Sequence, residues 1–210
     1  MPNPQGGATQ LAIDAIDAHA RRLLASRLGP LLLALDGPSG AGKSTLTAQL
    51  AAALGGCVVP ADDFFAAAIA DAEWAARSPQ RRAEDCLDWR WLRAEALEPL
   101  LAGRAARWRA FDFAAGPQPD GSYAMGEEIV ERQPAPFIVL DGAYSTRPEL
   151  LDLIHLTILV DVPRHIRHER LAAREDATFL DAWHRRWDAA EEYYFTQVRP
   201  RAAFDAVVES

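Results

Sequence analysis

The sequence predicts an α/β fold, with one central parallel sheet and helices on both of its faces. Five short apolar segments alternate with helical or loop stretches, as is typical of parallel strands joined by crossover helices. These segments are residues 31–35, 57–60, 137–140, 156–162 and 204–208. The chain has 210 residues and is 50% apolar, which is enough for one compact domain with a small lid.

The N-terminal quarter predicts a tail, a helix, a strand and a second helix. Residues 1–9, rich in Pro, Gly and Gln, predict a loose tail, and apolar side chains at helical spacing predict a helix over residues 10–27. The continuous apolar run at 31–35 is typical of a strand buried on both faces. A second helix is expected over residues 43–54, because Gly55-Gly56 supplies a C-terminal stop.

The middle of the chain is expected to be less regular. Residues 66–104 are rich in Ala and Arg and predict mostly helix. Residues 114–134 contain several Gly and Pro and predict an irregular insert, with a hairpin around Pro119-Asp120-Gly121. Without an internal repeat or a linker, residues 1–210 are expected to form a single domain.

Charge and cysteine content exclude several classes of protein. The net charge of −8 argues against a nucleic-acid partner, which would normally require a basic face. Cys57 and Cys86 have no metal-ligand spacing and nothing indicates an oxidising compartment, so neither a zinc site nor a disulfide is expected from them. No apolar run reaches membrane-spanning length, and a cytoplasmic protein without a membrane partner is expected. The oligomeric state stays open, a homo-oligomer included.

Residues 37–44 match the phosphate-binding pattern G-x-x-x-x-G-K-[ST] at every fixed position, after an apolar strand and at the start of a helix. The glycines let backbone N–H groups converge on phosphate oxygens, and the helix N-terminus adds partial positive charge. ATP and Mg²⁺ are therefore the expected cofactors. The residues expected to bind the nucleotide are Gly37, Pro38, Ser39, Gly40, Ala41, Gly42, Lys43, Ser44 and Thr45.

Lys43 is the only lysine among 22 positively charged residues. We expect its ammonium to reach the β- and γ-phosphates, and the Ser44 hydroxyl to bind Mg²⁺. A GTPase would carry N-K-x-D, which needs a second lysine, and a transporter ATPase would carry a signature similar to L-S-G-G-Q. Neither pattern is present, which leaves kinases and less common ATPases.

Two carboxylates, Asp62 and Asp63, follow the strand at 57–60, at the sheet edge where the γ-phosphate is expected. A carboxylate there can accept the proton of an acceptor hydroxyl, or hold Mg²⁺ through water. Two adjacent aspartates cannot both point the same way, and the alternative role for one of them is helix capping. We expect Asp62 to be the catalytic residue.

The segment Asp62-Asp63-Phe64-Phe65, placed after such a phosphate loop, resembles the uridine kinase family and its relatives, including the nicotinamide riboside kinases. The resemblance implies a P-loop three-layer sandwich with a five-stranded parallel sheet and a small helical lid. It also implies that Asp62 is the general base. Residues 137–142 resemble the family's third strand, which implies that Asp141 acts on Mg²⁺ or its water.

Two further segments resemble the family's acceptor site. Residues 85–89 resemble a D-A-F-D segment and residues 109–113 an x-x-Y-D-F segment, which implies acceptor contacts at Asp85, Phe111 and Asp112. Phe111 stands where the family often has tyrosine, and no histidine lies just beyond Phe113. These departures keep a different acceptor open.

Residues 164–178 resemble the family's lid, whose arginines embrace the ATP phosphates. Arg167, Arg170 and Arg174 lie at spacing i, i+3 and i+7 and therefore share one helical face. The resemblance implies phosphate contacts for all three and a catalytic role for Arg170 and Arg174. The alternative is a solvated charged face, which the neighbouring acidic residues would favour.

Together these features predict an ATP-dependent kinase that phosphorylates a hydroxyl of a small molecule, in the first place a nucleoside such as uridine. Two alternatives stay open. One is a kinase of a vitamin, sugar or antibiotic, and the other is a nucleotide-dependent switch without a small-molecule acceptor. Trp183, Trp187 and Tyr194 are expected to form the apolar stripe of a packing helix.

Overall fold

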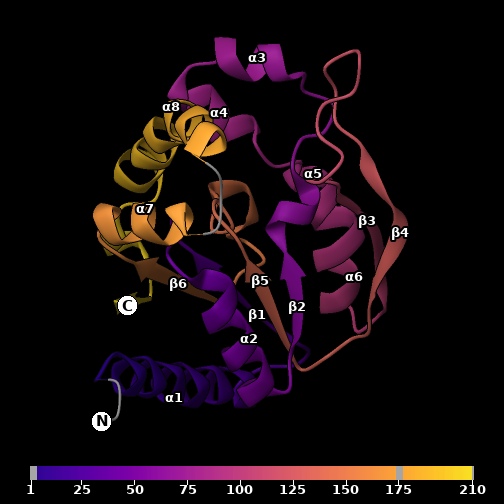
Figure 1. Cartoon of the computed structure of the whole chain (residues 1–210). Coiled ribbons are helices and arrows are strands. Elements are labelled where there is room, and N and C mark those ends of the chain that lie inside the picture. Colours follow the sequence, from indigo (N-terminus) through magenta and orange to yellow (C-terminus); the bar gives the residue numbers. More distant parts are fainter. Residues whose placement is uncertain (1–3, 174–176, 210) are drawn as a thin grey trace.

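The predicted five-stranded parallel sheet is present in the computed structural model, which describes residues 4–173 and 177–209 (Figure 1). Its strands run in the order β2-β5-β1-β6-β7. They are β1 (Leu31–Asp36), β2 (Cys57–Pro60), β5 (Phe137–Asp141), β6 (Leu156–Asp161) and β7 (Ala206–Glu209). Strand β1 has β5 on one side and β6 on the other, so the order of strands in the sheet reverses at β1. Sheets of this kind bind ligands at the carboxyl ends of the strands where the order reverses.

Both faces of the sheet are covered, since β1 is buried along its whole length. Leu31, Leu33 and Leu35 pack toward one layer of helices, and Leu32 and Ala34 toward the other. The first layer contains α1 (Pro4–Ala25) and α2 (Lys43–Leu54). The second contains α3 (Asp71–Ala76), α4 (Pro79–Asp85), α5 (Trp89–Trp91), η2 (Leu92–Leu97), α6 (Glu98–Leu101) and α8 (Ala177–Tyr193). The three-layer architecture is therefore confirmed.

The remaining elements lie at the ends of strands and helices. Three are short 3₁₀ helices, η1 (Ala61–Phe64), η3 (Pro148–Leu150) and η5 (Arg201–Ala203), and one is a π-helical segment, η4 (Tyr194–Val198). Helix α7 (Arg164–Ala172) follows β6 and lies beside α8 (Figure 1). It begins the stretch that was expected to be a lid. Among the described residues, no helix combines the length and apolar character that crossing a bilayer requires.

Two stretches are more regular than the sequence predicts. The first helix begins at Pro4 rather than at residue 10, so residues 4–9 are helical instead of a loose tail. Proline is well suited to a first helical turn, because its missing N–H would have no partner there. Residues 125–132 were expected to be irregular, but they form β4 (Met125–Arg132), which pairs with β3 (Ala106–Phe111) in an antiparallel hairpin.

The hairpin lies on the same side of the molecule as β2, the edge strand of the main sheet, with α5 and α6 between them in the view of Figure 1. The guanidinium of Arg132 donates to the carbonyl oxygen of Val58 at 2.9 Å, and the Trp108 indole donates to Asp63 at 2.7 Å. The predicted turn around Pro119-Asp120-Gly121 lies at the tip, where the Gly121 carbonyl accepts from the N–H of Asp71. The hairpin therefore fixes η1, the element that carries Asp62.

Candidate active site

The loop between β1 and α2 has the geometry of a phosphate cradle. Helix α2 begins at Lys43 after Gly42, and no side chain caps its N-terminus within the described part of the chain. The first N–H groups of a helix have no partner inside the helix. These amides are therefore left for an external acceptor, and an anion is the acceptor that the helix dipole favours.

Gly40 shows why the loop requires glycine. Its φ of +78° lies in the left-handed region, and a Cβ placed there would lie 2.6 Å from the carbonyl oxygen of Arg167. Residues of α7 therefore lie directly against the loop. The predicted phosphate loop and the predicted lid meet at this glycine.

The only lysine of the chain folds over the loop. The Lys43 ammonium donates to the carbonyl oxygens of Gly37 at 2.7 Å and Pro38 at 3.1 Å. It is also near enough to Asp62 and Asp141 to oppose the rise in their pKa. A compact ammonium on a long stem can exchange these carbonyls for phosphate oxygens without movement of the backbone.

The two predicted carboxylates meet at the carboxyl ends of neighbouring strands. Asp141 ends β5 opposite Pro60 of β2, and Asp62 comes two residues after Pro60. Gly142 permits this approach, because a Cβ there would lie 2.8 Å from the Cβ of Ala61. Asp62 is accessible to solvent, but it lines a cavity whose walls partly desolvate it. This partial desolvation raises the pKa of its carboxyl, and nearby carboxylates add to the effect.

Asp63 points to different partners. Its carboxylate accepts the Trp108 indole N–H, whereas Asp62 shares a cavity with Lys43. The structure thus separates the two adjacent aspartates, one toward the hairpin and one toward the phosphate loop.

The residues around Asp141 fit a magnesium ion with bound nucleotide. Asp141 Oδ1 and Thr47 Oγ1 are buried and have no hydrogen-bond partner among the described residues. Burial raises the pKa of Asp141, while the nearby Ser44 hydroxyl and Lys43 ammonium oppose the shift. Buried oxygens without partners are costly in a folded protein, and hard oxygen ligands are those that Mg²⁺ prefers. Ser44 and Asp141 are the residues that would hold the ion.

The lid arginines contact the rim of the phosphate loop. Arg167 Nη1 donates to the Ser39 carbonyl oxygen at 3.1 Å, and Arg170 Nη1 donates to that of Ala41 at 3.2 Å. Their guanidinium groups therefore lie beside the loop that is expected to bind phosphate. Arg174, the third predicted arginine, lies outside the described residues.

A buried carboxylate that sequence reasoning missed joins the lid to the loop. Glu191, on α8, is 5% exposed. Its Oε1 accepts the Ser39 N–H at 2.8 Å, and its Oε2 pairs with Arg167 at 3.3 Å. Glu191 follows Trp183 and Trp187 at four-residue spacing, so a charge in line with an apolar stripe was the available signal.

A cavity of about 100 Å³ lies beside the phosphate loop. Lys43, Asp62 and Glu191 provide its charged groups. Most of its remaining lining is aromatic or apolar: Phe65, Cys86, Leu87, Phe113, Ala143, Tyr144, Trp183 and Trp187. Trp183 and Trp187 thus line a cavity besides packing α8 against the core, which their helical spacing did not reveal.

Tyr144 is the most unusual residue of this lining. It has φ of +65° without being glycine, which is strained for a bulky side chain. Its hydroxyl is buried and has no hydrogen-bond partner within the described ranges. Burial raises the pKa of this hydroxyl well above its usual value, so it stays a neutral O–H donor.

Asp36 holds Tyr144 in place. This carboxylate, at the end of β1, is completely buried. It accepts the N–H groups of Gly37, Tyr144 and Thr146 at 2.8–2.9 Å, and the hydroxyls of Thr146 and Tyr194 at 2.6 and 2.9 Å. The first residue of the phosphate loop and the strained tyrosine therefore share one anchor, which no motif predicted.

The three residues predicted to contact the acceptor lie outside this lining. Asp85 pairs with Arg77 and Arg81, and Asp112 accepts the backbone N–H groups of residues 114 and 115. Phe111 is buried and packs edge to face against Phe65, with ring centroids 4.9 Å apart. Phe111 thus supports a ring that lines the cavity.

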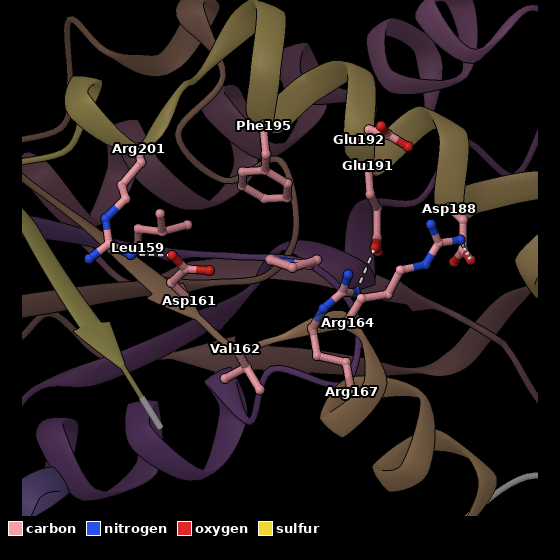
Figure 2. A pocket seen from close by; sticks show the side chains of 11 residues that line it. Leu159, Asp161, Val162, Arg164, Arg167, Asp188, Glu191, Glu192, Phe195 and Arg201 are labelled. Atoms are coloured by element: carbon pink, nitrogen blue, oxygen red, sulfur yellow. Dashed lines mark hydrogen bonds and ion pairs between the residues drawn. The ribbon is translucent and has the colours of Figure 1, made fainter.

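A larger cavity, of about 360 Å³, lies between α7, α8 and the end of β6 (Figure 2). Figure 2 shows Arg167 and Glu191 pointing toward one another, and Arg164 reaching Asp188. Glu191 lines both cavities, whereas its ion-pair partner Arg167 lines only the larger one.

Comparison with known proteins supports the fold. No family model and no curated protein sequence matches the chain. Among solved structures, a possible uridine kinase from Bacillus stearothermophilus is 21% identical, with a TM-score of 0.64 over 92% of this chain and 97% of that one. A protein provisionally named a fructose transport system kinase, from Silicibacter sp. TM1040, is 22% identical, with a TM-score of 0.66 over 91% and 97%. At these identities the likeness establishes the P-loop kinase fold.

Proposed function

We propose that this protein, which has the P-loop kinase fold, is an ATP-dependent kinase that phosphorylates a hydroxyl group of a small molecule. The observation that carries the proposal is the cavity beside the phosphate loop, which Lys43 and Asp62 line together. An acceptor in this cavity would meet a candidate base and the residue expected to bind the transferred phosphoryl group. A nucleotide switch has no need of such a cavity.

The residues around the phosphate loop divide the steps of this reaction among them. Asp62 accepts the proton of the acceptor hydroxyl, and its raised pKa brings its basicity closer to that required at neutral pH. Lys43, Arg167 and Arg170 bind the phosphates and stabilise the charge on the transferring group. Ser44 and Asp141 hold Mg²⁺, which when bound neutralises phosphate charge. The lid arginines on the loop help to exclude water from the site.

A nucleoside such as uridine is the first candidate acceptor. The aromatic lining suits a flat ring, since such rings stack on Phe and Trp side chains. Tyr144 offers a buried hydroxyl without a partner, which can bind a polar group of the acceptor. Phe113, 60% exposed, can move to admit a larger ring.

The size of the cavity favours a second candidate. Ligand sites commonly measure roughly 300–1,000 Å³. A cavity of about 100 Å³ accepts a small sugar or vitamin alcohol with less rearrangement than a nucleoside requires. A kinase of a non-nucleoside alcohol is therefore the alternative, with the same catalytic residues.

The test is ADP release from Mg²⁺-ATP in the presence of a panel of nucleosides, sugars and vitamins, with phosphorylated product identified by mass. We expect one acceptor to raise turnover well above the basal rate. Lys43→Ala should abolish the stimulated rate, and Asp62→Asn should lower it by about 10²–10⁴-fold, the usual contribution of a general base.

Asp63→Asn is the matched control, because an asparagine oxygen can still accept the Trp108 indole N–H. It should retain most of the stimulated rate. If no acceptor matters and Asp62→Asn leaves the basal rate unchanged, the base assignment is wrong. A nucleotide-dependent switch would then be the better interpretation.

A further inference from the structure

Outside the catalytic residues, two histidines and an aspartate converge where α7 meets α8. They are His168 on α7, and His184 and Asp188 on α8, and their ligand atoms all lie within 4.8 Å of one another. His168 Nε2 lies 3.3 Å from one carboxylate oxygen of Asp188, and His184 Nδ1 lies 3.0 Å from the other. The two imidazole rings are 4.0 Å apart between centroids.

The two nitrogen–carboxylate distances are close to those between the ligands of a small divalent metal. A tetrahedral zinc ion with bonds of about 2.0–2.2 Å spaces its ligand atoms roughly 3.3–3.6 Å apart. The set of two imidazoles and one carboxylate is a common zinc set that leaves a fourth position for water. The three side chains are 32, 24 and 13% exposed, so an ion and its water can reach them.

One group competes with a metal. Arg164 Nη2 lies 2.5 Å from Asp188 Oδ2, and Figure 2 shows this pair at the side of the larger cavity. Arg164 Nε lies 3.5 Å from His168 Nε2. Because the Arg164 side chain is 58% exposed, it can swing into solvent when an ion binds.

We propose that His168, His184 and Asp188 form a binding site for a divalent transition metal, such as zinc, that links α7 to α8. Arg167 and Arg170, which contact the phosphate loop, lie on the same short helix as His168. A bound ion would hold this helix against α8. The metal is distinct from the Mg²⁺ expected at Asp141, because its ligands include nitrogen and lie on the lid side.

The test is zinc binding to full-length protein without an affinity tag, measured by calorimetry after chelator treatment, with cobalt absorption as a second readout. We expect one ion per chain and a rise in melting temperature on binding. His168→Ala and His184→Ala should each weaken zinc binding at least 10-fold and remove the tetrahedral cobalt spectrum. His165→Ala, which changes an exposed histidine on the same helix, should bind as the wild type does.

The variant Arg164→Ala distinguishes a metal-binding site from a cluster that forms ion pairs only. Removal of the guanidinium frees Asp188, so zinc affinity should increase severalfold. Circular dichroism without metal checks that each variant is folded. Absence of stoichiometric zinc binding, or wild-type affinity in both histidine variants, would overturn the proposal, and neither result depends on kinase activity.

Discussion

Replacement of Gly40 by alanine should disturb the contact between the phosphate loop and α7. Two costs add. A non-glycine residue at φ +78° costs about 1–2 kcal/mol. The new methyl would also lie 2.6 Å from the Arg167 carbonyl oxygen, and overpacking of this kind typically costs about 1–3 kcal/mol. We therefore expect a loss of about 2–5 kcal/mol in the free energy of unfolding.

Gly55→Ala is the matched control for this prediction. Gly55 caps α2 with φ of +66°, but a Cβ there meets nothing within 4 Å. It should lose only the backbone cost of about 1–2 kcal/mol. The difference between the two variants isolates the contact with α7.

The assay is urea unfolding of both variants, together with ATP binding by calorimetry. Gly40→Ala should bind ATP more weakly, because displacement of α7 removes the contacts of Arg167 and Arg170 with the loop. Gly55→Ala should bind ATP normally. Equal losses of stability and equal ATP affinities in the two variants would refute the conclusion that α7 packs closely against the phosphate loop.

Five further substitutions, at four residues, test the groups of the site. Asp36→Ala leaves several buried donors without an acceptor, and it should lose at least about 3 kcal/mol of unfolding free energy, measured in urea. Asp36→Asn keeps one acceptor oxygen and should lose less. Asp62→Asn should stabilise the protein near neutral pH. Because the pKa of Asp62 is raised in the folded state, wild-type stability falls as pH rises from about 4 through the folded-state pKa. The difference in melting temperature between the variant and the wild type should therefore widen over that pH window and vanish below it. Glu191→Gln keeps an acceptor for the Ser39 N–H but removes the charge opposite Arg167, and a loss of about 1.5–3 kcal/mol is expected in urea; an unchanged midpoint would contradict the pairing. Tyr144→Phe should raise the KM of the acceptor and leave that of ATP unchanged, and equal effects on both would argue against acceptor binding by this hydroxyl.

The sheet could be predicted from sequence because its central strands β1, β5 and β6 are buried on both faces along almost all of their length. Such strands are continuous apolar runs, and each of the five predicted segments contains or overlaps an observed strand. Strand β4 was missed for the opposite reason. Its residues are half-buried or exposed and include three glutamates, so neither apolar periodicity nor β-propensity marked it.

The phosphate loop was predictable because the reason for each fixed residue of its motif lies within the loop itself. The rest of the site depends on contacts between distant segments. Glu191 reaches Ser39 across 152 residues, and Tyr194 reaches Asp36 across 158. On α8, the spacing of Trp183 and Trp187 indicated packing, which is correct, but a helical stripe cannot show that one side of it borders a cavity.

The single lysine ammonium, on the phosphate loop, gives the protein one specific site for chemical labelling. Apart from the chain's α-amino group, Lys43 is the single primary amine that an acylating reagent can modify. Its Nζ lies against two carbonyl oxygens, so its reactivity reports on the loop and on whatever binds there. Enzymes that acetylate or ubiquitinate lysine side chains would likewise find one target, and modification of it would remove the charge on which nucleotide binding depends.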